Sequence, residues 1–163
     1  MPNVFLAGMM GLAAPVTMAD AAQDAPPALN PGRVEVGRAI YRQHCASCHG
    51  PQGEGTPDWR EPNEQGELPP PPHGPEGHTW RHSDAALYRM ISQGWRDPFN
   101  KTKRLTMPAF QDVLSPEEIR AVITYLKTLW TPEQRRFQWE ESREKPFPPE
   151  AREPASATPT RSD

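Results

Sequence analysis

The segment "HCASCHG", residues 44–50, contains both cysteines of this 163-residue chain, Cys45 and Cys48, followed at once by His49. A disulfide across two intervening residues would close a very small loop and would therefore gain little entropy. A redox dithiol is expected next to a β-α-β pattern, which the sequence does not show. A zinc site needs four ligands, usually in two clusters, and no second pair of suitable spacing is present.

The Cys-x-x-Cys-His spacing is the pattern of c-type haem attachment. Two cysteines three positions apart lie close together on a helical turn, so their sulfur atoms can reach the two vinyl groups on one edge of a porphyrin. The next residue then places an imidazole under the iron. We therefore predict that Cys45 and Cys48 form thioether bonds to one haem c and that His49 is the proximal ligand of the haem iron.

Apolar residues at helical spacing predict three helices, over residues 34–48, 84–93 and 116–130. The third helix has the clearest start, because Ser115 and Glu118 are placed as a capping box around a proline at the first helical position. No segment shows the alternating pattern of a β-strand. The predicted fold class is therefore all-α.

Proline is unusually frequent, with 22 residues, whereas 35% of all residues are hydrophobic. Residues 51–80 hold eight of these prolines and predict a long proline-rich loop, which in a small domain is either functional or wraps a ligand. A small core often needs a covalent or metal staple, which a haem would supply. The net charge of −3, with no basic stripe, argues against nucleic acid as a partner.

The two ends of the chain differ from its centre. An apolar run that ends in "ADA" predicts a secretory signal peptide over residues 1–21, although no Lys or Arg precedes the run. An uncleaved N-terminal membrane anchor is the alternative, which Pro15 and the shortness of the run disfavour. Residues 22–32 are expected to be a disordered lead-in. Residues 131–163 are expected to be a largely disordered extension, with at most a further short helix at its start.

Four blocks, "GRAIYRQHCASCHG", "DAALYRMISQG", "MPAF" and "LSPEEIRAVITYLKTL", follow one another in an order that resembles the class I c-type cytochromes over residues 33–130. The resemblance implies three to four helices around one covalently bound haem, with the first and last helices crossing. Gly37 on the first helix would then face Tyr125 and Leu126 on the last, since glycine permits close approach of two backbones. Tyr41 belongs to the same face of the first helix.

Met107 is the predicted sixth ligand of the haem iron. It lies in an irregular segment before Pro108, which fixes the local backbone, and the resemblance places the methionine ligand in such a Met-Pro pair. The alternative is a methionine that only fills a gap beneath the haem. Met90 is expected in the core, because it lies on the apolar face of a predicted helix.

Several other histidines and arginines could also have functional roles, although they are not predicted to bind the haem iron. His44 is expected at the surface, and His73 in the proline-rich loop. His78 and His82, four positions apart, leave a second metal such as copper as a weaker hypothesis, against the simpler interpretation of hydrogen-bonding histidines in a polar loop. Arg96 and Arg104 could pair with haem propionates or lie in solvent.

These predictions describe an exported, periplasmic mono-haem cytochrome that passes single electrons between redox partner proteins. It would not be an enzyme with a substrate of its own, and no stable membrane span is expected once the signal is removed. Two alternatives stay open. The chain could be the electron-accepting subunit of a periplasmic dehydrogenase or oxidase complex, with residues 51–80 and the C-terminal extension as docking elements. It could also be a haem-based sensor with a labile sixth ligand.

Overall fold

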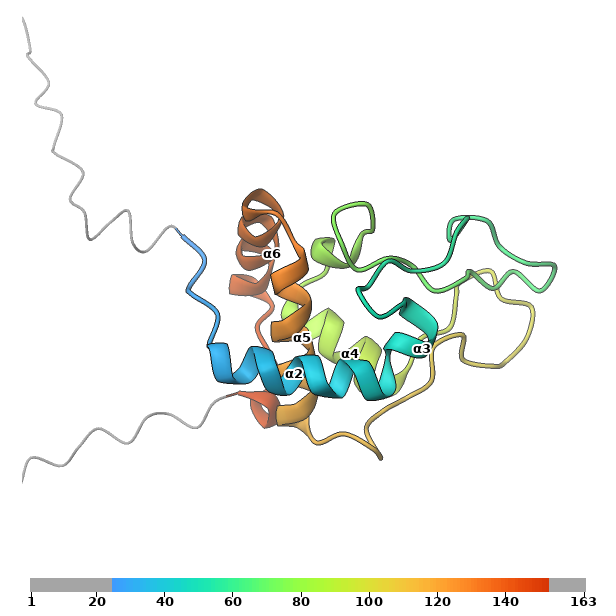
Figure 1. Ribbon diagram of the computed structural model, residues 1–163. Coiled ribbons are helices and arrows are strands. Elements are labelled where there is room, and N and C mark those ends of the chain that lie inside the picture. Colours follow the sequence, from blue (N-terminus) through green and yellow to red (C-terminus); the bar gives the residue numbers. More distant parts are fainter. Residues whose placement is uncertain (1–24, 153–163) are drawn as a thin grey trace, which may run out of the picture.

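A computed structural model describes residues 25–152 of the chain (Figure 1). The predicted signal peptide, residues 1–21, lies outside the described residues, as does the end of the extension from residue 153. The helices are α2 (Pro31–His44), α3 (Ala46–His49), α4 (Asp84–Gln93), α5 (Pro116–Leu126) and α6 (Pro132–Glu144), with 3-10 turns η1 (Thr79–Arg81), η2 (Lys127–Leu129) and η3 (Pro149–Ala151). Within 25–152 there is no strand, which confirms the predicted all-α class.

The first predicted helix is two helices with a break at Cys45. Its start lies at Pro31 rather than at residue 34, because the Asn30 side chain accepts a hydrogen bond from the amide of Arg33 at 3.0 Å and caps the helix. Cys45, with φ −114°, ends α2 and begins α3. Gly50, with φ +82°, ends α3.

Helices α2 and α5 cross and form the centre of the fold (Figure 1). Gly37 lies so close to α5 that an added Cβ would be 1.9 Å from the carbonyl oxygen of Ala121. The Tyr41 and Tyr125 rings lie 5.2 Å apart across the same interface. The predicted crossing at Gly37 is therefore present. The buried core around it includes Val34, Leu87, Ile91, Ile119, Val122, Ile123, Leu126 and Trp130.

The other two predicted helices begin where their capping residues indicate. Ser83 accepts a hydrogen bond from the amide of Ala86 and caps α4, which ends before Gly94 as predicted. The predicted capping box of α5 is formed in both directions by Ser115 and Glu118. The α-helical part of the third helix ends at Leu126, and one 3-10 turn continues it to Leu129.

The prediction of a largely disordered extension is corrected for its described part. The Thr131 side chain caps α6, and the Gln138 side chain, 1% exposed, donates hydrogen bonds to Asp84 Oδ1 at 2.8 Å and Ser142 Oγ at 2.9 Å. Asp84 also forms an ion pair with Lys127 at 2.7 Å. These buried polar contacts fix α6 against the start of α4.

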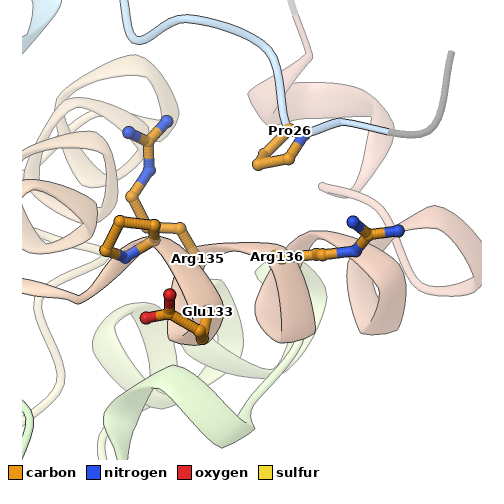
Figure 2. Close-up of a pocket in the computed structure, with 5 residues that line it drawn as sticks. Pro26, Glu133, Arg135 and Arg136 are labelled. Atoms are coloured by element: carbon orange, nitrogen blue, oxygen red, sulfur yellow. The ribbon is translucent and has the colours of Figure 1, made fainter. Parts of the chain in front are cut away.

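The lead-in is likewise ordered from residue 25. The Arg135 guanidinium donates a hydrogen bond to the carbonyl of Pro27 at 3.2 Å, and Leu29 packs against the core. Pro26 lines a shallow pocket together with residues at the start of α6, which are Pro132, Glu133, Arg135 and Arg136 (Figure 2). Within 25–152, no helix is both long enough and apolar enough to span a bilayer.

Candidate functional site

The two cysteines lie at the junction of α2 and α3 and are both free thiols. The Cys45 side chain is half-buried and packs against the hydrophobic core, whereas Cys48 is exposed. Burial, with a smaller contribution from Cys48, raises the pKa of the Cys45 thiol to about 11. The amide of His49 donates to the carbonyl of Cys45 at 3.0 Å, so the whole motif is one helical turn.

The imidazole of His49 is buried and oriented by the proline-rich loop. Its Nδ1 lies 3.0 Å from the carbonyl oxygen of Pro71. Because a carbonyl can only accept, Nδ1 carries the hydrogen and Nε2 carries the lone pair that can bind a metal. Burial lowers the pKa of His49, which favours this neutral form, and the Pro71 bond opposes the shift only in part.

His73 forms a second layer behind this imidazole. Its ring stacks on the His49 ring with centroids 4.2 Å apart. The His73 Nδ1 lies 2.9 Å from the Thr79 hydroxyl, and the His73 carbonyl accepts a hydrogen bond from Trp130 Nε1 at 2.8 Å. Burial and the neighbouring His49 lower the pKa of His73 well below its usual range. This histidine therefore supports the position of His49, a role that its place in a proline-rich loop did not predict.

Met107 lies in the segment that follows α4. Its backbone pairs with Trp95 in an isolated antiparallel bridge, with N···O distances of 2.9 Å and 3.0 Å. Its side chain is half-buried and packs against the same core as Cys45. Gly94, with φ +78°, lets this segment approach, because an added Cβ would lie 2.7 Å from the Met107 carbonyl oxygen.

The histidines considered for a second metal form an aromatic cluster. The His78 ring stacks on Trp59 with centroids 5.2 Å apart, and the His82 ring meets His78 edge-on at 5.3 Å. Among the described residues, no group of three His, Cys, Asp or Glu side chains could hold a metal ion. The copper hypothesis therefore has no support in this part of the chain. His44 lies edge-on to Phe110 and is half-buried rather than at the surface.

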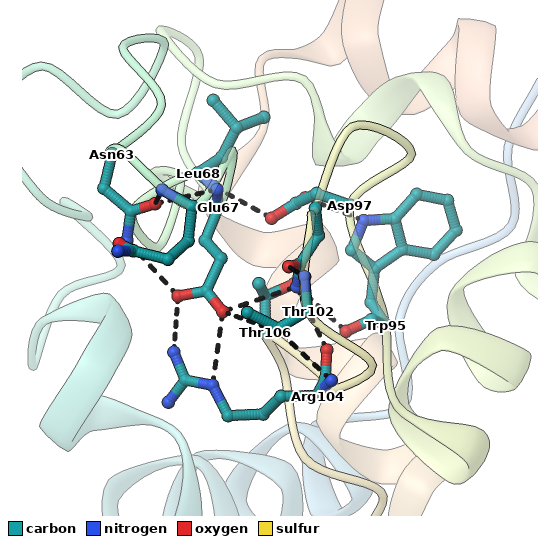
Figure 3. Close-up of polar contacts among 10 residues, drawn as sticks. Asn63, Glu67, Leu68, Trp95, Asp97, Thr102, Arg104 and Thr106 are labelled. Carbon is teal, nitrogen blue, oxygen red and sulfur yellow. Dashed lines mark hydrogen bonds and ion pairs between the residues drawn. The ribbon is translucent and has the colours of Figure 1, made fainter.

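A buried carboxylate that sequence reasoning missed joins the proline-rich loop to the segment of Met107 (Figure 3). Glu67 is 6% exposed, and it forms an ion pair with Arg104, whose Nε donates at 3.2 Å. Asn63 Nδ2 donates to the same carboxylate at 3.2 Å, and Asn100 Nδ2 and Thr102 Oγ1 each approach it at 3.4 Å. Arg104 thus pairs with Glu67, although 71% of its side chain stays exposed.

Comparison with known families decides the identity of this fold. The family model described as cytochrome c matches residues 34–130. This chain belongs to the cytochrome c family. A relative of this cytochrome c is the Cbb3-type cytochrome c oxidase subunit FixP of Sinorhizobium medicae, 26% identical over 104 residues. The match covers 63% of this chain and 32% of FixP, so the chain spans about a third of the length of that relative.

As a cytochrome c, the protein carries covalently bound haem c and transfers electrons. The described residues fit this cofactor. Cys45 and Cys48 are unbridged thiols on one turn, and the hydrogen bond from His49 to Pro71 leaves Nε2 for the iron. The two loops joined by Glu67 also present apolar side chains that a porphyrin could cover. Each of them is 39% to 41% exposed: Leu68, Trp95 and Leu105.

Proposed function

We propose that this cytochrome c is a mono-haem, one-electron carrier that works outside the cytoplasm, with His49 and Met107 as the two axial ligands. The observation that carries the proposal is the hydrogen bond from His49 Nδ1 to the Pro71 carbonyl, which presents Nε2 from a buried, fixed imidazole. The chain has two cysteines, enough for one attachment motif. Partners would be a redox donor and a redox acceptor protein.

The protein's own residues set the conditions for electron transfer. Haem c, when bound, would accept a single electron from one partner and pass it to another. Thioether bonds from Cys45 and Cys48 keep the cofactor in place without relying on affinity. A thioether ligand from Met107 would raise the reduction potential, because this soft sulfur favours the ferrous state. Burial of His49 against His73 limits access of water on that side.

Absorption spectra of the periplasmically matured protein test this proposal. We expect a low-spin spectrum with the weak far-red band of methionine-bound ferric haem, and no change when carbon monoxide is added to the ferrous form. Met107→Ala should abolish the band, allow carbon monoxide binding and lower the potential by on the order of 100 mV. Carbon monoxide binding by the unmutated protein would instead favour a sensor with a labile sixth ligand.

A second candidate function is that of a cytochrome subunit in a larger oxidase complex. The similarity to FixP, named as a subunit of a cbb3-type cytochrome c oxidase, favours this possibility. Helix α6 would then supply a surface beyond the 34–130 cytochrome c match for contact with another subunit. Purification from membranes and from the periplasmic fraction distinguishes the two. A free carrier would elute alone, whereas a subunit would elute with a larger partner.

A further inference from the structure

The segment between Trp95 and Met107 is a closed loop. The backbone bridge between these two residues joins its ends, so the loop starts at Trp95 and ends at Met107, the predicted sixth ligand. Inside the loop, Asn100 is 4% exposed and donates to the Arg104 carbonyl at 3.1 Å, while its Oδ1 accepts from the amide of Thr102 at 2.7 Å. We call residues 95–107 the methionine loop.

The methionine loop has its own polar interior, and its tip at Phe99 lacks apolar packing. Phe99 is 86% exposed, so its side chain buries little surface within the described structure. A segment that lacks buried apolar contacts opens more readily than the rest of a protein. Polar contacts with a neighbouring element therefore contribute to its closed state.

The neighbouring element is the part of the proline-rich loop over residues 63–68. The Lys101 amide donates to the Gln65 carbonyl at 2.8 Å, and the Leu68 amide donates to Asp97 Oδ2 at 2.8 Å. Gly66, with φ +79°, lies so close that an added Cβ would be 2.3 Å from the Phe99 carbonyl oxygen. Figure 3 shows the Glu67 carboxylate between the methionine loop and residues 63–68, facing the Arg104 guanidinium.

We propose that Glu67 is a positioning residue that holds the methionine loop closed against the proline-rich loop and so keeps Met107 on the haem iron. This inference rests on the proposed ligation by Met107. Of the five side chains in the Glu67 network, Asn100, Thr102 and Arg104 come from the methionine loop. Opening the loop would therefore separate a buried carboxylate from most of its donors.

The charge of Glu67 matters as well as its shape. The Arg104 hydrogen bonds, with help from Asn63, lower the pKa of this carboxyl, so it is ionised at neutral pH. An ionised carboxylate accepts every hydrogen bond offered to it, whereas a glutamine amide would turn donor hydrogens toward Arg104, Asn63 or Asn100. Glu67→Gln is therefore expected to weaken the closed loop while it preserves side-chain volume.

The test uses the complete haem-loaded protein and measures how readily carbon monoxide replaces the sixth ligand in the ferrous state. Carbon monoxide can bind only when the loop opens, so its binding rate reports the open fraction. We expect Glu67→Gln to bind carbon monoxide at least about tenfold faster than the unmutated protein, whose spectrum should stay unchanged over the same time, and to show a weaker far-red band in the ferric state. Glu61→Gln is the matched control, because it removes the same charge from an exposed position of the same loop.

Arg104→Met provides a second route if Glu67→Gln fails to mature. The Arg104 side chain is 71% exposed, so its loss should not disturb the core, and carbon monoxide should again bind faster. Binding rates and far-red bands equal to those of Glu61→Gln in both variants would overturn the inference. If Met107→Ala also leaves the far-red band and carbon monoxide binding unchanged, Met107 is not the sixth ligand and the proposed function fails. If Met107→Ala changes both but the Glu67 and Arg104 variants change neither, only the proposed role of Glu67 fails.

Discussion

Replacement of Gly37 by alanine tests the helix crossing on which the whole domain is built. The new Cβ would lie 1.9 Å from the carbonyl oxygen of Ala121, 2.5 Å from its carbonyl carbon and 3.0 Å from Cβ of Tyr125. Real Cβ atoms essentially never come within 3.0 Å of such atoms. Because the nearest atoms belong to the α5 backbone, no side-chain rotation can relieve the contact, and α2 and α5 must separate by about 1 Å.

Two opposing effects set the size of the change. Overpacking of a dense interior costs roughly 1 to 3 kcal/mol, and a backbone clash belongs at the upper end of that range. Alanine in a helix is favoured over glycine by about 1 kcal/mol. We therefore expect Gly37→Ala to lower the free energy of unfolding by about 2 kcal/mol. For a domain of this size, that loss corresponds to a melting temperature lower by roughly 8 °C.

Gly32→Ala is the matched control, since it makes the same substitution in the same helix. Its Cβ would meet no atom nearer than 3.4 Å, so the variant should be as stable as the unmutated protein or slightly more stable. Guanidinium unfolding of the haem-loaded proteins, followed by circular dichroism, measures both effects. A Gly37→Ala protein at least as stable as the Gly32→Ala protein would refute the close crossing of α2 and α5.

Three further predictions address other parts of the structure. Gly94→Ala should displace the Met107 carbonyl, at a cost of about 1 to 3 kcal/mol of backbone strain, and an undiminished far-red band would contradict this. Gln138→Ala should destabilise the protein by about 2 kcal/mol, because Asp84 loses a buried donor, and an unchanged urea midpoint would show that α6 adds no stability. Burial lowers the pKa of His78 below its ordinary 6.5, so His78 binds a proton more readily in the unfolded chain than in the folded protein. Stability should accordingly be independent of this group above about pH 6.5 and fall as the pH drops below that value, and His78→Gln should reduce that fall in urea titrations at several pH values.

Local signals predicted the fold well where a helix has a sequence-encoded boundary. Ser83 and Ser115 place the starts of α4 and α5, because a cap depends on residues only three positions away. The family resemblance anticipated the crossing at Gly37, whose partner Ala121 is distant in sequence. The break at Cys45 was not predicted, since apolar spacing continues through it and only the backbone angles of that residue reveal it.

The missed features depend on contacts between distant segments. Glu67 looks like any exposed glutamate in a polar, proline-rich loop, and nothing near it in the sequence indicates that Arg104 will bury it. Gln138 lies in a segment whose composition is typical of disorder, yet its side chain bonds to Asp84. His73 stacks on His49 for the same reason, because the fold of the loop brings them together. Pairings of this kind come from tertiary structure, which local propensity does not encode.

The run of four prolines, residues 69–72, has a consequence for the speed of electron transfer. A proline carbonyl accepts hydrogen bonds but its nitrogen donates none, so this ribbon offers acceptors alone: Pro70 accepts from Thr56 at 3.0 Å and Pro71 from His49 at 3.0 Å. Its backbone has few alternative conformations to visit, either before folding or after it. The Pro71 carbonyl belongs to this stiff segment, so it should move little when the charge on the haem iron beside His49 changes. A small nuclear rearrangement on each change of oxidation state lowers the barrier to exchanging an electron.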